Sequence, residues 1–256
     1  MATPRLSTIL GTHVDRYTRL EFRMFLQRAA SSSRVHRMVT LNPEIALAAR
    51  RDPRYAATVR TADVVTIDGV GIALALRLCG GGPSERITGT HVLEDVCTLA
   101  MERESAVTFL LREDGLTSPP LLRAACSRRW PTLRCAIATV NPSLPIDASL
   151  VAAMNDAAPT YLLVNFGHPI QELWLTEHLD RFRSVRVAAG IGGAVDYLSG
   201  AAPRPPAPIH RLGLEWAWRL IRQPWRARRI ARAAIVFPLM IVLDAVQGQQ
   251  FIMRER

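Results

Sequence analysis

Short apolar runs rich in Val, Ile and Leu alternate with longer, helix-like runs along most of this chain of 256 residues. This alternation is typical of a mostly parallel β-sheet with helices packed on its faces. The expected strands are Arg37–Leu41, Val64–Ile67, Val107–Leu111, Arg134–Val140, Tyr161–Phe166 and Arg186–Ala189. The expected helices are Pro43–Arg51, Gly71–Cys79, His91–Arg103, Ser118–Arg128, Ala148–Asn155 and Ile170–His178. The pattern therefore predicts an α/β fold.

The Pro-rich stretch GAAPRPPAPIH, residues 200–210, is the one obvious linker in the sequence. We therefore expect an α/β core over residues 1–200. Residues 201–256 are expected to form the linker and a helical appendage rich in Arg and Trp. Apolar residues of the appendage recur every three or four positions along one predicted helix face: Leu214, Trp218, Ile221 and Trp225. Arginines recur at a similar spacing on another face: Arg219, Arg222, Arg226 and Arg229.

Positive charge is concentrated near the end of the chain. All 32 basic side chains are arginines, and the formal net charge is +10. Residues 201–232 hold eight of these arginines against one acid, Glu215. A compact basic region of this kind favours a partner that carries phosphates, such as a nucleotide, a nucleic acid or an anionic membrane surface.

The remaining compositional features point to a reduced, cytosolic compartment. The four cysteines show no C-x-x-C spacing, and the amino-terminal residues lack the continuous apolar core of a signal peptide. The apolar segment 233–246 is interrupted by Pro238 and Asp244. It is shorter than the roughly 20 residues that a membrane-spanning helix needs. We expect it either to lie in a membrane interface or to pack on the protein.

Four junctions between a predicted strand and the following helix carry polar residues or glycines: 40–44, 67–71, 165–172 and 188–196. The carboxyl ends of parallel strands meet at one edge of a sheet, so these junctions are expected to lie together there. At this point Asp68 could be a helix N-cap or a catalytic base.

Other residues at these junctions also allow more than one interpretation. Asn42 could be a simple turn or cap residue, and Gln171 a solvated residue of a first helical turn. His168 and Glu172 are four positions apart, but without a third candidate ligand they do not predict a metal site. The glycines of the second junction lack the spacing of a dinucleotide-binding fingerprint, which disfavours NAD. The chain also contains no Asp-x-Asp pair.

Several longer stretches occur together and in a distinctive order: TLNPEIALAARRDPRY, ADVVTIDGVG, ERITGTHVLED, NFGHPIQELW, AGIGGAVDYLSG and RLGLEWAWRLIRQPWRARR. Over residues 8–232 they resemble successive motifs of the WecG/TagA/CpsF family of bacterial glycosyltransferases. The resemblance implies a Rossmann-like α/β core with a helical C-terminal appendage. It also implies inverting, metal-independent transfer from a UDP-sugar to a polyprenyl-diphosphate-linked saccharide, in cell-surface or exopolysaccharide synthesis.

The partners implied by the resemblance are the UDP-sugar, the lipid-linked acceptor saccharide and the cytoplasmic face of the cell membrane, where the enzyme would be peripheral. A homo-oligomer is compatible with it, and neither a cofactor nor a nucleic acid is expected.

Single residues of this chain match functional positions of the family. Asp68 matches the proposed general base of the family. Pocket residues are matched by Thr40, Asn42, Arg86, Gln171 and Asp196. Basic residues of the appendage, thought to engage the diphosphate, are matched by Arg219, Arg226 and Arg229. The chain departs from the family pattern at His91, where an acid is common, at His168, where a small residue is usual, and at Ile170, where a basic residue is usual. These departures concern the identity of the sugars more than the reaction.

Two rival functions remain open on the sequence. The Arg-rich end alone permits a basic nucleic-acid-binding protein, although it lacks a recognised nucleic-acid-binding fold and Asp68 would repel a phosphate backbone. The other rival is an enzyme that uses a different nucleotide cofactor.

Overall fold

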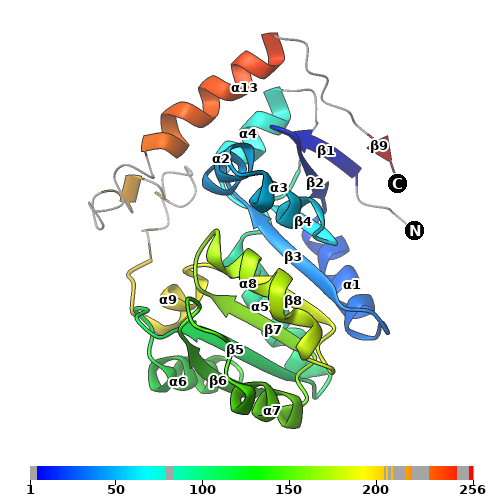
Figure 1. Ribbon diagram of the computed structural model, residues 1–256, viewed down its shortest axis with the longest axis vertical. Helices are drawn as coiled ribbons and strands as arrows, with labels where there is room; N and C mark the ends of the chain where they lie inside the picture. Colours follow the sequence, from blue (N-terminus) through cyan, green and yellow to red (C-terminus); the bar gives the residue numbers. More distant parts are fainter. Residues whose placement is uncertain are drawn as a thin grey trace.

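A six-stranded, fully parallel β-sheet forms the centre of the molecule, with strand order β4-β3-β8-β7-β5-β6 (Figure 1). The computed structural model describes residues 5–78, 84–204, 206, 209, 217, 218, 220, 231–246, 254 and 255. The six strands are β3 (His36–Leu41), β4 (Val64–Ile67), β5 (Ala106–Arg112), β6 (Arg134–Val140), β7 (Tyr161–Asn165) and β8 (Val187–Gly190). The predicted α/β fold is confirmed, and each predicted strand matches an observed one to within a residue at either end.

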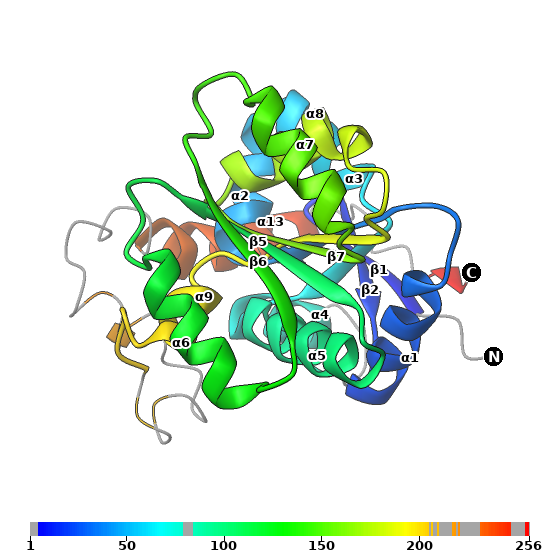
Figure 2. The same cartoon turned by 90° about the horizontal axis from the view of Figure 1, so that it is seen from below.

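Helices cover both faces of this sheet. They are α1 (Arg19–Ala30), α2 (Pro43–Arg51), α3 (Pro53–Arg60), α4 (Val70–Leu78), α5 (Gly89–Glu102), α6 (Pro119–Arg129), α7 (Ala148–Ala157), α8 (Ile170–His178) and α9 (Ala194–Ser199). Figure 2 shows α1, α5 and α6 on one side and α2, α3, α7 and α8 on the other. Successive strand residues point to opposite faces, so Phe109 packs in the first layer and Leu110 in the second.

Capping residues explain where several helices differ from the prediction. The helix expected from His91 begins at Gly89, because the Thr88 hydroxyl caps it by accepting the backbone N–H of His91. The additional helix α3 begins just after α2 ends, because the Asp52 carboxylate accepts the N–H groups of Arg54 and Tyr55. Both differences come from one polar side chain that satisfies the free N–H groups of a first helical turn.

An antiparallel hairpin precedes the central sheet and was not predicted. Its strands are β1 (Arg5–Ile9) and β2 (Thr12–Arg16), and the short strand β9 (Arg254–Glu255) pairs with β1. The turn uses positive φ at both Leu10 and Gly11, as a two-residue type I′ turn requires. The buried Asp15 carboxylate accepts the N–H of Val65 at 2.8 Å, so the hairpin is bonded to the β4 edge of the sheet.

The apolar segment near the C-terminus forms the π-helical turn η3 (Arg232–Val236) followed by α13 (Phe237–Val246). One face of α13 buries Phe237 and Ile241 against the core. Arg50 donates to both carboxylate oxygens of Asp244 at 3.0 and 2.8 Å. Among the described helices, none is long and apolar enough to cross a membrane.

The opposite face of this segment is apolar and exposed. It consists of Ile235, Leu239, Val242 and Leu243, called here the outer face of α13. The segment therefore packs on the protein with one face and presents an apolar surface with the other. The predicted boundary between residues 200 and 201 stays a prediction. The arginine stripe of the appendage lies outside the described residues, as do Leu214, Ile221 and Trp225.

Candidate active site

The four polar junctions lie at one edge of the sheet, as predicted. They follow β4, β3, β8 and β7, which are consecutive neighbours in the strand order. All four strands are parallel, so their carboxyl ends open on the same side. In open α/β sheets this edge is where ligands bind, because loops there are free to vary while the strands hold them in place.

Asp68 directly follows β4 and is half-buried. Its Oδ2 accepts the backbone N–H of Gly89, the first residue of α5, at 3.4 Å. A Cβ at Gly89 would lie 2.6 Å from the carbonyl oxygen of Ile191, so glycine is required for this close approach. Asp68 is thus held at the amino end of a helix 21 positions further along the chain. If Asp68 were only an N-cap of α4, this contact with α5 would not be needed.

Thr40 and Asn42 stand at the end of β3. The buried Thr40 hydroxyl donates to the carbonyl oxygen of Gly190 at 3.4 Å, which links the ends of β3 and β8. Asn42 is the N-cap of α2, because its Oδ1 accepts the N–H of Ile45 at 3.0 Å. The cap interpretation of Asn42 is therefore confirmed. Its Nδ2 group has no partner within the described part of the chain and keeps two N–H groups for a ligand.

Gln171 joins the loops that follow β7 and β8. Its Oε1 accepts the N–H of Gly167 and the N–H of Gly192, both at 3.2 Å. The side chain is 2% exposed, so the interpretation of Gln171 as a solvated residue is wrong. A Cβ at Gly190 would lie 2.5 Å from its Nε2, which leaves room there for glycine alone. Gln171 therefore fixes two loops of the candidate site.

A buried carboxylate orients this amide, a role that the sequence analysis did not predict for it. Glu172 is 1% exposed and accepts from Gln171 Nε2 at 2.7 Å and from the Tyr55 hydroxyl at 2.9 Å. Burial raises the pKa of Glu172, and the hydrogen bonds from Gln171 and Tyr55 act in the opposite direction. Burial likewise raises the pKa of Tyr55. His168 forms a hydrogen bond with Glu44 at 2.7 Å, whereas Glu172 bonds to Gln171 and Tyr55, so the two side chains do not act as a pair.

Asp196 lies in the first turn of α9 and is half-buried. Its Oδ1 accepts the Thr117 hydroxyl at 2.7 Å and the Asn165 amide at 3.5 Å. Thr117 is itself buried in the connection between β5 and α6. The predicted site residue thus joins the ends of β5 and β7, through two partners that the sequence did not suggest.

Arg86 precedes α5 in a segment that runs beside the end of β4. Ile87 donates its N–H to the carbonyl of Ile67, and its own carbonyl accepts the Thr66 hydroxyl, both at 2.8 Å. The carbonyl of Arg86 lies 2.9 Å from His91 Nδ1. Burial, followed by the charge of Arg19, lowers the pKa of His91. The N–H of Thr88 lies 3.4 Å from the same His91 nitrogen, so the ring is held against the segment that carries Arg86.

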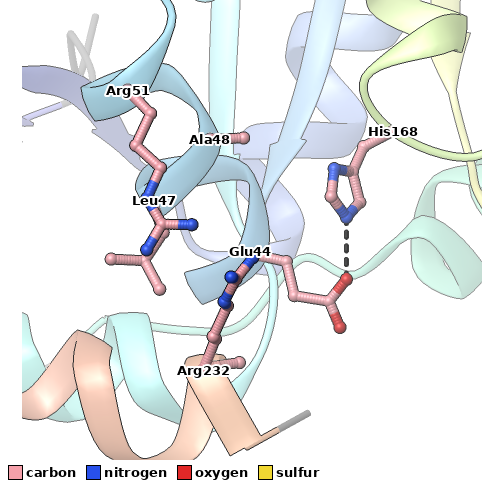
Figure 3. Close-up of a pocket in the computed structure, with 7 residues that line it drawn as sticks. Glu44, Leu47, Ala48, Arg51, His168 and Arg232 are labelled. Atoms are coloured by element: carbon pink, nitrogen blue, oxygen red, sulfur yellow. Dashed lines mark hydrogen bonds and ion pairs between the residues drawn. The ribbon is translucent and has the colours of Figure 1, made fainter. Parts of the chain in front are cut away.

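A hollow of about 140 Å³ lies beside this edge, between α2 and η3 (Figure 3). Its lining residues are Glu44, Leu47, Ala48, Arg51, His168, Arg232 and Ala233. Within the described ranges, no three His, Cys, Asp or Glu side chains gather in a way that could hold a metal ion. Three predicted site residues, Arg219, Arg226 and Arg229, lie outside those ranges.

Comparison with known proteins identifies the family of this chain. The model of the Glycosyl transferase WecG/TagA/CpsF family matches residues 7–250. The N-acetylglucosaminyldiphosphoundecaprenol N-acetyl-beta-D-mannosaminyltransferase of Bacillus subtilis (strain 168) is 30% identical over 193 residues, 75% of this chain and 73% of the relative. A protein of the same name from Staphylococcus aureus (strain MW2) is 28% identical over 228 residues, 88% and 86% of the two chains. The chain therefore belongs to the WecG/TagA/CpsF family of glycosyl transferases.

Proposed function

We propose that this protein moves a sugar, with inversion, from a UDP-sugar to a saccharide linked to a polyprenyl diphosphate, during synthesis of a cell-surface polysaccharide. The observation that carries the proposal is the Asp68 carboxylate at the carboxyl edge of the sheet of a glycosyl transferase family member. The Bacillus and Staphylococcus relatives are named for transfer to a sugar-diphosphoundecaprenol, which supports a lipid-diphosphate acceptor. The donor sugar in this proposal is a hexose or an N-acetylhexosamine.

Asp68 acts as the general base. Its carboxylate takes the proton of the acceptor hydroxyl while that oxygen attacks the anomeric carbon of the donor from the face opposite UDP. The new bond joins the acceptor oxygen to the anomeric carbon, the bond to UDP breaks, and its electron pair stays on the diphosphate. The N–H of Gly89 holds one carboxylate oxygen in place, which favours a fixed direction for proton transfer.

The other predicted site residues take two kinds of role. Asn42, Arg86 and Asp196 bind substrate in this proposal, and Asn42 supplies N–H groups that its capping bond leaves over. Thr40 and Gln171 act by position, since their hydrogen bonds run to neighbouring loops of the protein. Fixed loops favour catalysis because the substrate-binding groups need little reorganisation during the reaction.

Charge on the leaving diphosphate is neutralised by arginine in this proposal, without a metal ion. Arg219, Arg226 and Arg229 of the appendage are assigned this role from the family motif. A guanidinium suits it because two parallel N–H groups match two phosphate oxygens.

The outer face of α13 holds the protein peripherally on the cytoplasmic face of the cell membrane. Ile235 is 67% exposed and Leu239 56%, values that are high for large apolar side chains on one helical segment. Asp244 is turned inward and paired with Arg50, so it places no acid on this face. An apolar helix face flanked by basic residues is typical of interfacial membrane binding.

The direct test is an assay with a panel of UDP-sugars and synthetic lipid-diphosphate acceptors, with products identified by mass spectrometry and the anomeric configuration read by NMR. We expect one UDP-sugar to be consumed and a single inverted linkage to form. Retention of configuration would contradict the general-base mechanism. A thermal-shift comparison of UDP, NAD and DNA separates the two rival functions, because a ligand that binds the folded state raises its melting temperature.

A further inference from the structure

The hollow between α2 and η3 brings together two arginines that have no acidic partner among the described residues. Arg51 stands at the end of α2 and Arg232 at the start of η3. Figure 3 shows their side chains extending toward each other along α2. Within the part of the chain that the structure describes, neither guanidinium lies within ion-pair distance of a carboxylate. Two facing positive charges repel each other, and an anion between them removes that repulsion.

The rest of the lining limits what this anion can be. Glu44 faces the hollow, but its carboxylate is bonded to His168 at 2.7 Å, and Leu47 and Ala233 add apolar surface. The volume of about 140 Å³ is below the roughly 300–1,000 Å³ of pockets that enclose a whole small molecule. The hollow therefore fits an anionic group rather than a complete nucleotide. A phosphate group matches both the size and the two guanidinium forks.

The position of the hollow indicates where such a phosphate comes from. Arg232 is three positions before Ile235, the first residue of the outer face of α13. A group bound at Arg232 therefore lies next to an exposed apolar surface. A phosphate attached to an apolar chain can contact both the two arginines and the outer face of α13, whereas a free phosphate would contact the arginines alone.

We propose that this hollow binds the phosphate of an anionic lipid headgroup, so that α13 docks on the membrane with a defined orientation. The inference rests on the membrane role given to α13 under the proposed function, and not on the transfer reaction. It adds a specific lipid contact at Arg51 and Arg232 to what would otherwise be a general attraction between a basic protein and an anionic leaflet.

The test is sedimentation of the full-length protein with vesicles, without donor or acceptor. Phosphatidylglycerol vesicles are compared with phosphatidylcholine vesicles that carry the same surface charge as oleate. Variants are Arg51→Gln and Arg232→Gln, with Arg77→Gln as the matched control. Arg77 is an exposed arginine in the last turn of α4, a helix that packs against α13, but it does not line the hollow. Melting temperatures of all three variants should equal that of the wild type.

We expect the wild type to prefer phosphatidylglycerol vesicles to oleate vesicles. Arg51→Gln and Arg232→Gln should each weaken phosphatidylglycerol binding by about tenfold and abolish the preference. Arg77→Gln should cost at most about fivefold, as expected for one basic residue near an anionic leaflet. Equal losses in all three variants, or no preference in the wild type, would overturn the lipid-phosphate site while leaving membrane docking intact.

Two further outcomes separate the sources of phosphate. If inorganic pyrophosphate raises the melting temperature in an Arg51-dependent way and no vesicle binds, the hollow takes a free phosphate and the lipid assignment is wrong. If the wild type binds neither vesicles nor pyrophosphate, both the site and the membrane role of α13 fall, whereas the transfer reaction is tested separately by its own assay.

Discussion

At the carboxyl edge of the sheet the polar side chains of Gln171 and Glu172 are almost completely buried, whereas on α13 the apolar side chains of Leu239 and Val242 are more than half exposed. The usual distribution of polar and apolar residues is reversed in both regions. At the edge, the buried polar atoms bond to one another and to loop N–H groups, so position is fixed. On α13, more than half of each of these apolar side chains is open to solvent and so can meet another surface.

The two regions therefore contribute to the protein in different ways. Burying a polar group without a partner costs free energy, so a fully bonded network of buried groups has one favoured geometry. An exposed apolar face has the opposite property, because it gains free energy by leaving water. The edge holds loops in fixed positions, and the outer face of α13 presents apolar surface to solvent.

The largest effect is expected at the edge. Asp68→Asn keeps the shape of the side chain but removes the proton acceptor, so turnover should fall by about 10²–10⁴-fold. Asp114→Asn is the matched control, because its carboxylate is 70% exposed and lies on the loop after β5. Initial rates with the lipid-linked acceptor measure the change. Near-normal turnover of Asp68→Asn would return Asp68 to a purely structural role.

A second substitution tests the buried network. Glu172→Leu leaves the donors of Gln171 and Tyr55 unpaired, so the free energy of unfolding should fall by about 1–3 kcal/mol. Glu172→Gln should lose less, because its amide can accept from Gln171 and donate to Tyr55. Urea unfolding measures both variants, and vesicle binding should remain at the wild-type level. Equal losses in the two variants would show that Glu172 does not act through these hydrogen bonds.

The outer face of α13 is tested by a substitution that should leave the fold alone. Leu239→Ser removes apolar surface that enters the membrane in the proposed function, so vesicle binding should weaken by about 1.5 kcal/mol, or roughly tenfold. Leu121→Ser on α6 is the control, since Leu121 is also about half exposed but α6 lies at the opposite end of the molecule from α13 (Figure 1). Equal vesicle binding of the two variants would show that α13 is not the docking face.

The pH dependence of stability offers a smaller effect. Burial raises the pKa of folded Glu172 above its ordinary value of 4.5, so the folded state holds the proton more strongly than the unfolded state. The associated stability is fully present below pH 4.5 and is lost as pH rises through the folded pKa. As pH rises, the free energy of unfolding of the wild type should therefore fall relative to that of Glu172→Gln, because Gln does not titrate. Parallel curves for the two proteins would contradict a raised pKa.

The last prediction is that removing metal ions has no effect on turnover. Turnover should be unchanged by EDTA, because arginines neutralise the leaving diphosphate in the proposed mechanism. Assays before and after chelation measure this directly. Loss of turnover that Mg²⁺ or Mn²⁺ restores would show that the edge uses a cation and would overturn metal independence.

Some of the fold was readable from local signals. Val64–Ile67 and Arg134–Val140 begin and end as predicted, since an apolar strand bounded by polar and turn residues is a property of neighbouring positions. The helix α1, which was not predicted, has an equally local signal in the capping box of Thr18 and Glu21. The hairpin offered less, because THVDR does not alternate clearly between apolar and polar residues.

The α/β fold, the family and the position of Asp68 at the end of a strand could all be predicted from the sequence. Strand and helix periods are properties of neighbouring residues, and the order of the motifs is read directly along the chain. The tertiary structure alone decided that Gln171 is buried, that Tyr55 bonds Glu172 across 117 positions, and which face of α13 is exposed. These features depend on which helix packs on which layer of the sheet. Residues distant in the sequence come into contact only when the layers pack together, and local hydrophobic periodicity does not predict such contacts.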